Sequence, residues 1–220
     1  MRNMNWNFCA TLLCVAVLGS TLAACAPIVL GGAAMGALVA TDRRTSGAQL
    51  EDEGIELRAA NRLRDALGVR GHINVNSYNR QALLTGEVAS AQDKLLAEQT
   101  VARVENVRAI VNELAVMGSS TLTQRSSDVL VAGRVRAALV DAQDLYANAF
   151  QLVVERGTVH IMGRVTQREA ERATTVVRNV SGVQKVVRVF EIISDQELQR
   201  LLPQPAKPSN TTTSGGSPGG

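Results

Sequence analysis

Apolar residues recur in the same pattern in two stretches of the chain, residues 53–116 and 127–193, which lie about 76 positions apart. Each stretch opens with apolar residues at i, i+4 and i+8, the spacing of an amphipathic helix. Two strands of alternating apolar and polar residues follow, then a second helix and a final strand. The pattern therefore predicts an internal duplication with the element order αββαβ in each copy.

Matching apolar positions define each expected element. The first helices carry Ile55, Ala59 and Leu63, and Val131, Val135 and Leu139. The strand pairs carry Ile73, Val75, Ala82, Leu84 and Val88, and Phe150, Leu152, Val159, Ile161 and Val165, with a turn near Asn79 and at Arg156-Gly157. The second helices carry Ala97, Val101 and Val104, and Ala173, Val177 and Val180; the last strands carry Ile110, Leu114 and Val116, and Val186, Phe190 and Ile192.

This order predicts an α+β fold of two tandem αββαβ units, with helices packed on one face of small mixed three-stranded sheets. Each unit has roughly 65 residues, enough for only a marginal core. We therefore expect the two units to pack together, with residues 51–118 and 126–194 as the domains and residues 119–125 as a linker.

The beginning of the chain is typical of a secretory signal peptide, because Arg2 precedes an apolar run over residues 8–18. The following Leu22-Ala23-Ala24-Cys25 resembles the lipobox of bacterial lipoproteins. We expect residues 1–24 to be removed and Cys25 to be lipidated. The alternative is an ordinary signal peptide followed by an incidental cysteine.

The cysteine count supports lipidation, since Cys9 and Cys14 lie in the signal and only Cys25 would remain in an exported protein. Ala26, in place of Asp, favours the periplasm-facing leaflet of the outer membrane by analogy with enterobacterial sorting. Residues 25–50 are predicted to be a lipidated linker, whose apolar stretch 27–40 is too short to span a bilayer. Residues 195–220, rich in Pro, Ser, Thr and Gly from Pro203 onward, are predicted to be a disordered tail.

Two short phrases carry a family resemblance. Residues 84–88 (LTGEV) and 161–165 (IMGRV), with turns at residues 106–107 and 181–183, resemble the signature of the BON domain. Together with the lipobox and the lead-in at residues 41–56, they make the chain similar to dual-BON outer-membrane lipoproteins. The resemblance implies binding to phospholipid membranes and a role in keeping the outer membrane intact under stress.

The two copies differ in charge. Residues 51–118 hold ten acids and eight bases, a balance of −2, whereas residues 125–193 hold ten bases and seven acids, a balance of +3. The second copy also has Val129 and Leu130 where the first has Glu53 and Gly54. Apolar side chains beside arginines suit a helix that binds anionic phospholipid. The predicted phospholipid-binding residues are Val129, Leu130, Gly133, Arg134, Arg136 and Ala137. The alternative is that Val129 and Leu130 pack against the first unit or residues 27–40.

Other classes of function lack support in the sequence. No nucleophile elbow, metal-ligand cluster or paired carboxylates is present, so we predict no enzymatic activity, no metal and no cofactor. Aromatic residues make up 3% of the chain, too few for nucleic-acid stacking. We interpret His72 and His160 as surface or edge residues, Tyr146 and Phe150 as core or inter-unit contacts, and residues 126–128 as a helix N-cap. The competing function is a scaffold that docks on outer-membrane assembly or division proteins.

Overall fold

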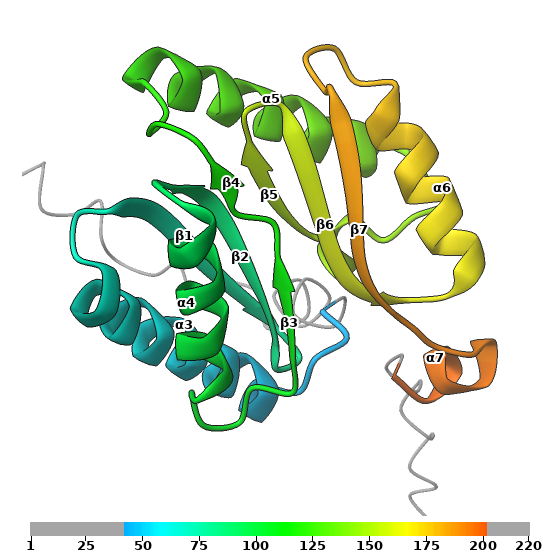
Figure 1. Ribbon diagram of the computed structural model, residues 1–220. Helices are drawn as coiled ribbons and strands as arrows, with labels where there is room; N and C mark the ends of the chain where they lie inside the picture. The colour runs from blue at the N-terminus through cyan, green and yellow to red at the C-terminus, as the bar shows by residue number, and fades with distance from the viewer. Residues whose placement is uncertain (1–41, 202–220) are drawn as a thin grey trace, which may run out of the picture. The chain divides into compact units, whose positions relative to one another are not determined.

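Residues 42–201 are described by the computed structural model, and they form two successive α+β domains (Figure 1). The first comprises α3 (Ser46–Leu67), β1 (Gly71–Tyr78), β2 (Gln81–Val88), α4 (Ala91–Ala102), β3 (Ala109–Asn112) and β4 (Ala115–Val116). The second comprises α5 (Leu122–Asp141), a 3-10 turn (Ala147–Ala149), β5 (Gln151–Glu155), β6 (Thr158–Val165), α6 (Gln167–Arg178), β7 (Lys185–Ile192) and α7 (Asp195–Leu201). The predicted duplication and fold class are confirmed.

The two sheets share one topology. In each domain a hairpin pairs two antiparallel strands, β1 with β2 and β5 with β6, and the last strand runs parallel to the second. The last strand of the first domain is interrupted, so that β3 and β4 pair separately with β2. At the interruption, Leu114 is buried and its amide donates to the side chain of Asn112 at 3.3 Å.

Each domain has its own core between its two long helices and one face of its sheet (Figure 1). The predicted helix stripes lie there, with Ile55 and Ala59 in the first core and Val131 and Val135 in the second. All four side chains are at most 3% exposed. The spacing of apolar residues along the sequence thus predicted correctly which side of each helix is buried.

The opposite faces of the two sheets are also buried. A third apolar cluster joins Tyr78 and Leu83 of the first domain to Met162 and Val189 of the second. Polar residues are buried beside it, including His160 of β6, which is 3% exposed. The interpretation of His160 as a surface or edge residue is therefore wrong. It failed because the sheet face that would otherwise meet solvent packs against the other domain.

The first helix of each domain begins before the predicted domain boundary, at Ser46 and at Leu122. Thr45 caps α3 by accepting a hydrogen bond from the Ala48 amide at 3.1 Å. Thr121 caps α5, and Gln124 bonds back to the Thr121 amide at 2.8 Å to complete a capping box. The linkers expected at residues 25–50 and 119–125 therefore end within helices, and the N-cap expected at residues 126–128 is wrong because those residues lie inside α5.

The C-terminal boundary also needs correction. Residues 195–201 form helix α7, so the disordered tail expected from residue 195 does not begin there. Glu197 of α7 pairs with Arg164 of β6 at 2.6 Å, which attaches the helix to the second domain. The signal peptide, Cys25, the apolar stretch 27–40 and the Pro/Ser/Thr/Gly segment from Pro203 lie outside the described residues.

The two hairpin turns are held by the same device. Their central residues, Asn79-Arg80 and Arg156-Gly157, all have positive φ, between 50° and 71°, as type I′ turns require. Asp52 accepts from the amides of the first pair at 2.8 and 2.7 Å. Asp128 accepts from the amides of the second pair, both at 2.8 Å. A buried carboxylate on the first helix therefore fixes the turn in each domain.

Candidate functional site

The outer face of α5 carries the predicted phospholipid-binding residues. Their placement follows from the buried stripe of the helix, since Val131, Val135 and Leu139 face the core and the opposite side meets solvent. Val129 is 71% and Leu130 is 62% exposed. Neither is buried against the first domain, although Val129 borders a cavity that His72 and Asn74 of that domain also line. The alternative contact with residues 27–40 lies outside the described part of the chain. Gly133, Arg134, Arg136 and Ala137 are exposed on the same helix.

Two further apolar residues extend this face. Leu122 is 80% and Val140 is 62% exposed. At about 100° per residue, Leu122, Val129 and Val140 fall within roughly 20° of one another around the helix, and Leu130 lies about 80° to one side of Leu122. We call Leu122, Val129, Leu130 and Val140 the α5 apolar row. Sequence reasoning missed its two ends, although the i, i+7 spacing from Leu122 to Val129 is visible in the sequence.

Arg134 and Arg136 flank the α5 apolar row. Arg134 Nη1 donates to the Ser181 carbonyl at 3.4 Å. Arg136 Nη1 lies 3.4 Å from the carbonyls of Ala147 and Phe150. These contacts are longer than most protein hydrogen bonds, and within residues 42–201 neither guanidinium has a carboxylate partner. Both cations therefore remain available to an anion from outside the protein.

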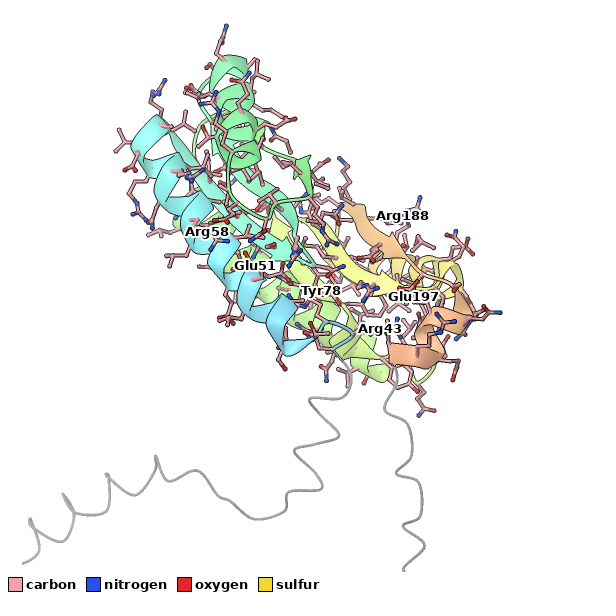
Figure 2. All side chains as sticks on the ribbon, turned by 90° about the horizontal axis from the view of Figure 1, so that it is seen from below. Arg43, Glu51, Arg58, Tyr78, Arg188 and Glu197 are labelled. Atoms are coloured by element: carbon pink, nitrogen blue, oxygen red, sulfur yellow. The ribbon has the colours of Figure 1, made fainter. Side chains whose placement is uncertain are left out.

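The corresponding arginine of the first domain is neutralised. Arg58 occupies on α3 the position of Arg134 on α5, and it meets the equivalent carbonyl, that of Glu105, at 3.4 Å. Arg58 also pairs with Glu51 at 2.6 Å. The second domain has Ser127 where the first has Glu51. A single exchange of residue type thus separates a paired arginine from an unpaired one (Figure 2 labels Arg58 and Glu51).

A mixed-charge cavity of about 370 Å³ lies beside the C-terminal half of α5. Its lining includes Asp42, Arg44, Glu53, Glu56 and Arg136. Burial raises the pKa of the Glu56 carboxyl, which accepts a hydrogen bond from the Ser77 amide at 2.7 Å. The cavity brings the start of the described chain, at Asp42, next to one of the predicted phospholipid-binding residues.

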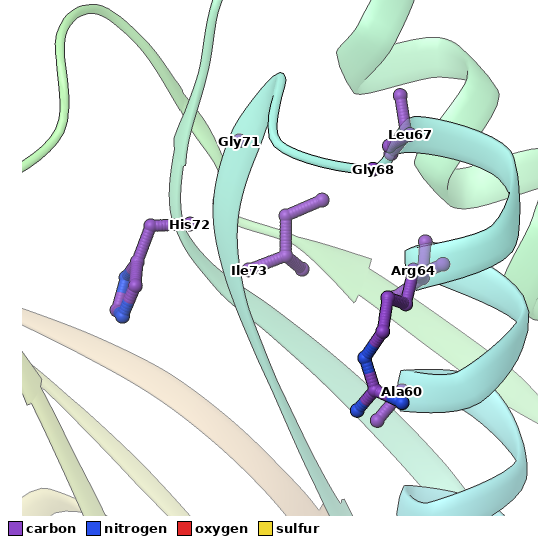
Figure 3. Close-up of a pocket in the computed structure, with 8 residues that line it drawn as sticks. Ala60, Arg64, Leu67, Gly68, Gly71, His72 and Ile73 are labelled. Atoms are coloured by element: carbon purple, nitrogen blue, oxygen red, sulfur yellow. The ribbon is translucent and has the colours of Figure 1, made fainter.

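Each of the two histidines lies near one carboxylate. His72 lies 3.8 Å from Glu87, and His160 lies 3.9 Å from Glu113. Figure 3 shows the cavity of about 230 Å³ between α3 and β1, where Ile73 points toward the helix and the ring of His72 points away from it. Within residues 42–201 no group of three His, Cys, Asp or Glu side chains is placed to hold a metal ion.

The two aromatic residues expected to be core or inter-unit contacts separate in the structure. Phe150 is buried and packs edge-on against Phe190, with ring centroids 6.1 Å apart. Tyr146 is 51% exposed, so the interpretation is wrong for that residue. The 3-10 turn that follows Tyr146 was not expected, and it separates the two aromatic side chains. Tyr146 therefore contributes little to the core.

The fold and sequence together define the class of this protein. The BON domain model matches residues 51–118 and 127–194, so the chain belongs to the BON family and carries two such domains. None of the helices of residues 42–201 is long and apolar enough to cross a membrane.

Named relatives narrow the class. The chain is similar to outer membrane lipoprotein DolP of Haemophilus influenzae, with 35% identity over 181 residues that cover 80% of this chain and 94% of the relative. It is also similar to a 21 kDa hemolysin of Actinobacillus pleuropneumoniae, with 31% identity over 154 residues, 69% of this chain and 79% of the relative. The chain is thus a dual-BON protein of the DolP-like outer-membrane lipoprotein type.

The chain is also similar to a solved structure, the C-terminal domain of CdsD from the type III secretion system of Chlamydia trachomatis. The match covers 61% of this chain and 96% of the solved one. The identity is 12% and the TM-score 0.27, too low to carry an argument about this protein.

Proposed function

We propose that this protein is a non-enzymatic envelope lipoprotein that binds anionic phospholipid through the outer face of α5 and supports outer-membrane integrity. Lipidated Cys25 attaches it to the periplasm-facing leaflet of the outer membrane. The observation that carries the proposal is the pair of unpaired arginines, Arg134 and Arg136, beside an exposed apolar row. In the first domain Glu51 neutralises the arginine equivalent to Arg134. Helix α3 also carries exposed Leu50 and Leu57, so the contrast between the domains rests on this one arginine and on Val129 and Leu130.

The chemistry of the face suits the boundary between lipid headgroups and acyl chains. Full burial of an aliphatic side chain contributes about 1.5–3 kcal/mol, and partial insertion of the α5 apolar row contributes a fraction of that for each residue. Each arginine near an anionic surface adds about 1 kcal/mol. Together these free energies describe weak binding. Weak binding is enough because the anchor at Cys25 already holds the outer face of α5 at high local concentration beside the bilayer.

The place where the described chain begins also supports contact between the outer face of α5 and the membrane that holds the anchor. Asp42 and Arg44 border the cavity that Arg136 also lines, so the described chain begins beside the proposed lipid face. About 17 residues separate Cys25 from Asp42, and a segment of that length reaches at most about 60 Å. A lipid at Cys25 and the face of α5 can therefore occupy the same membrane.

Flotation with liposomes tests the proposal. The protein from residue 25 onward, with Cys25→Ser to remove the anchor, is mixed with vesicles that contain 30–40% phosphatidylglycerol in phosphatidylcholine (on the order of one anionic lipid in three). We expect Leu130→Glu with Arg134→Glu to reduce binding at least about tenfold, because it removes one apolar side chain, adds one negative charge and reverses one positive charge. The matched control, Leu57→Glu with Arg58→Glu on α3, should bind like the wild type. Equal binding by the wild type and the α5 variant would reject the proposal.

The second candidate function is a scaffold that docks on outer-membrane assembly or division proteins. Leu50 and Leu57, which are 71% and 65% exposed on α3, favour it because they offer an apolar contact away from α5. Crosslinking in intact cells separates the two candidates. A dominant protein adduct through α3 supports the scaffold, whereas crosslinks only to lipid through α5 support the membrane function.

A further inference from the structure

The segment that precedes the first domain makes a buried ion pair with the second domain. Arg43 donates to both carboxylate oxygens of Glu169, at 2.9 and 2.6 Å, and both side chains are 3% exposed. The same guanidinium donates to the Arg164 carbonyl at 2.8 Å. Glu169 lies in the first turn of α6, where its side chain also bonds to the Thr166 amide at 2.9 Å. Arg43 therefore completes the N-terminus of a helix from which it is 126 residues distant in the sequence.

The next residue holds the first domain. Arg44 pairs with the buried Asp52 at 2.9 Å and with Asp42 at 2.8 Å. Its guanidinium also lies over the ring of Tyr78, 4.3 Å from the centroid, in a cation–π contact. Two successive arginines thus contact two different domains (Figure 2 labels Arg43 and Tyr78).

The duplication shows that the arrangement in the second domain is unusual. Asp93 occupies on α4 the position of Glu169 on α6, and it pairs with Arg70 of its own domain at 2.8 Å. The stretch of the second domain that corresponds to Arg70 reads Tyr146-Ala147 and holds no arginine. In the first domain the helix-capping carboxylate therefore pairs with an arginine of the same domain. In the second domain it pairs with Arg43, from the segment that precedes the first domain.

We propose that Arg43-Arg44 is a clasp that locks the two domains into one body, with Arg43 as the positioning residue for the second domain. A carboxylate left buried without its partner is strongly unfavourable, so the second domain keeps Glu169 paired only while the lead-in stays docked. The clasp adds to direct bonds between the domains, which include Arg156 to Glu87 at 2.7 Å and Asn74 to Glu155 at 2.6 Å. The clasp does not depend on lipid binding by α5.

Hydrogen exchange measured by mass spectrometry tests the clasp on the chain from residue 25 onward with Cys25→Ser. In Arg43→Gln we expect exchange to rise roughly 100-fold in the inner strands β2 and β6, as well as at the start of α6, because the domains separate more often. The control Arg70→Gln breaks the equivalent pair within one domain and should affect only the start of α4 and the end of α3, whose Ala66 carbonyl Arg70 also binds. An Arg43→Gln effect confined to the first turn of α6 would overturn the proposal.

A second variant guards against simple misfolding. Arg43→Gln with Glu169→Gln leaves no charge at the site of this ion pair and keeps a residue that can complete the capping box of α6. Spin labels at Asp65→Cys on α3 and Arg178→Cys on α6, both exposed positions, report the distance between the domains. We expect a narrow distribution in the labelled parent and a broad one in the double variant, with helix content unchanged by circular dichroism. Identical narrow distributions would contradict the clasp.

Discussion

The two domains of this chain share one fold, and in each of them a carboxylate of the first helix holds the hairpin turn. They differ in which groups pair with their charged side chains. In the first domain Arg58 pairs with Glu51, and Asp93 pairs with Arg70. In the second, the arginine equivalent to Arg58 has no acidic partner among the described residues, and the acid equivalent to Asp93 is paired from outside the domain by Arg43. At these two positions the first domain pairs its charges internally and the second does not. Elsewhere the two domains pair with each other, as Arg156 does with Glu87 at 2.7 Å.

This difference separates the residues that maintain the fold from those that give a copy its function. Asp52 and Asp128 perform the same task in both domains. The outer faces of α3 and α5 do not contribute to either core, so their residues are free to diverge. Function belongs to the site rather than to the shared fold.

The largest expected effect concerns Asp52 and Asp128, the carboxylates that hold the two hairpin turns. Asp52→Ala leaves two turn amides, Ser77 and Arg44 without their common acceptor, and we expect the free energy of unfolding to fall by about 3–5 kcal/mol. Asp128→Ala removes only two amide bonds and should cost about 2–3 kcal/mol. Urea denaturation measures both. If Asp128→Ala cost as much as Asp52→Ala, the additional bonds of Asp52 would contribute nothing.

The next largest effect is expected when residues are exchanged between the outer faces of α5 and α3. Val129→Glu with Leu130→Gly gives α5 the residues found at the same positions of α3, and we expect binding to anionic vesicles to weaken by about tenfold or more. The reverse change on α3, Glu53→Val with Gly54→Leu, should restore part of the binding to that variant. Vesicle flotation of the two proteins measures this. A failure of the α5 exchange to weaken binding would show that the apolar difference is not functional.

A smaller effect follows from pairing one arginine. Ser127→Glu places on α5 the acid that neutralises the equivalent arginine on α3, and we expect affinity for anionic vesicles to fall roughly fivefold. The change lies on the exposed side of the helix, so thermal unfolding should be nearly unchanged. Titration at low and high salt measures the difference between wild type and variant, which should shrink as salt screens the charges. An unchanged affinity at low salt would mean that Arg134 does not contact phosphate.

The smallest effect concerns the contact between the sheets. Burial lowers the pKa of His160, although Glu113 opposes this shift, so the folded state binds fewer protons than the unfolded chain as the pH falls below about 6.5. Stability should therefore decrease as the pH falls through that range and level off below the folded-state pKa. Urea midpoints between pH 7.5 and 5 (on the order of two pH units) measure the slope. His160→Gln should flatten it, and an unchanged slope would assign the dependence to other groups.

Much of the fold was predictable from local periodicity. The stripe from Ile55 to Leu63 and its counterpart on α5 placed both helices, and Arg156-Gly157 marked a turn correctly. The same periodicity could not reveal that His160 faces the other domain, because alternation along a strand gives its two faces but not the occupant of each. The predicted start of α5 at residues 126–128 was wrong because the side chain of Thr121 caps the helix earlier.

The candidate site divides in the same way. The contrast of Val129 and Leu130 with Glu53 and Gly54 was visible in an alignment of the two copies, and their exposure agrees with a surface role that remains a proposal. The pairing of Arg43 with Glu169 was not visible, because it joins the segment before the first domain to the second domain and has no counterpart in the duplication. An arginine in a lead-in carries no local signal of its distant partner.

Chemical-shift mapping with anionic lipid tests the central claim most directly. The isotopically labelled chain with Cys25→Ser is titrated with small phosphatidylglycerol-containing bicelles, and backbone shifts are followed in both domains. We expect the largest shifts along residues 122–140 of α5, with residues 46–67 of α3 nearly unchanged. Shifts concentrated on α3, or no shifts on α5 at lipid concentrations that bind the protein, would contradict the division of labour between the two domains.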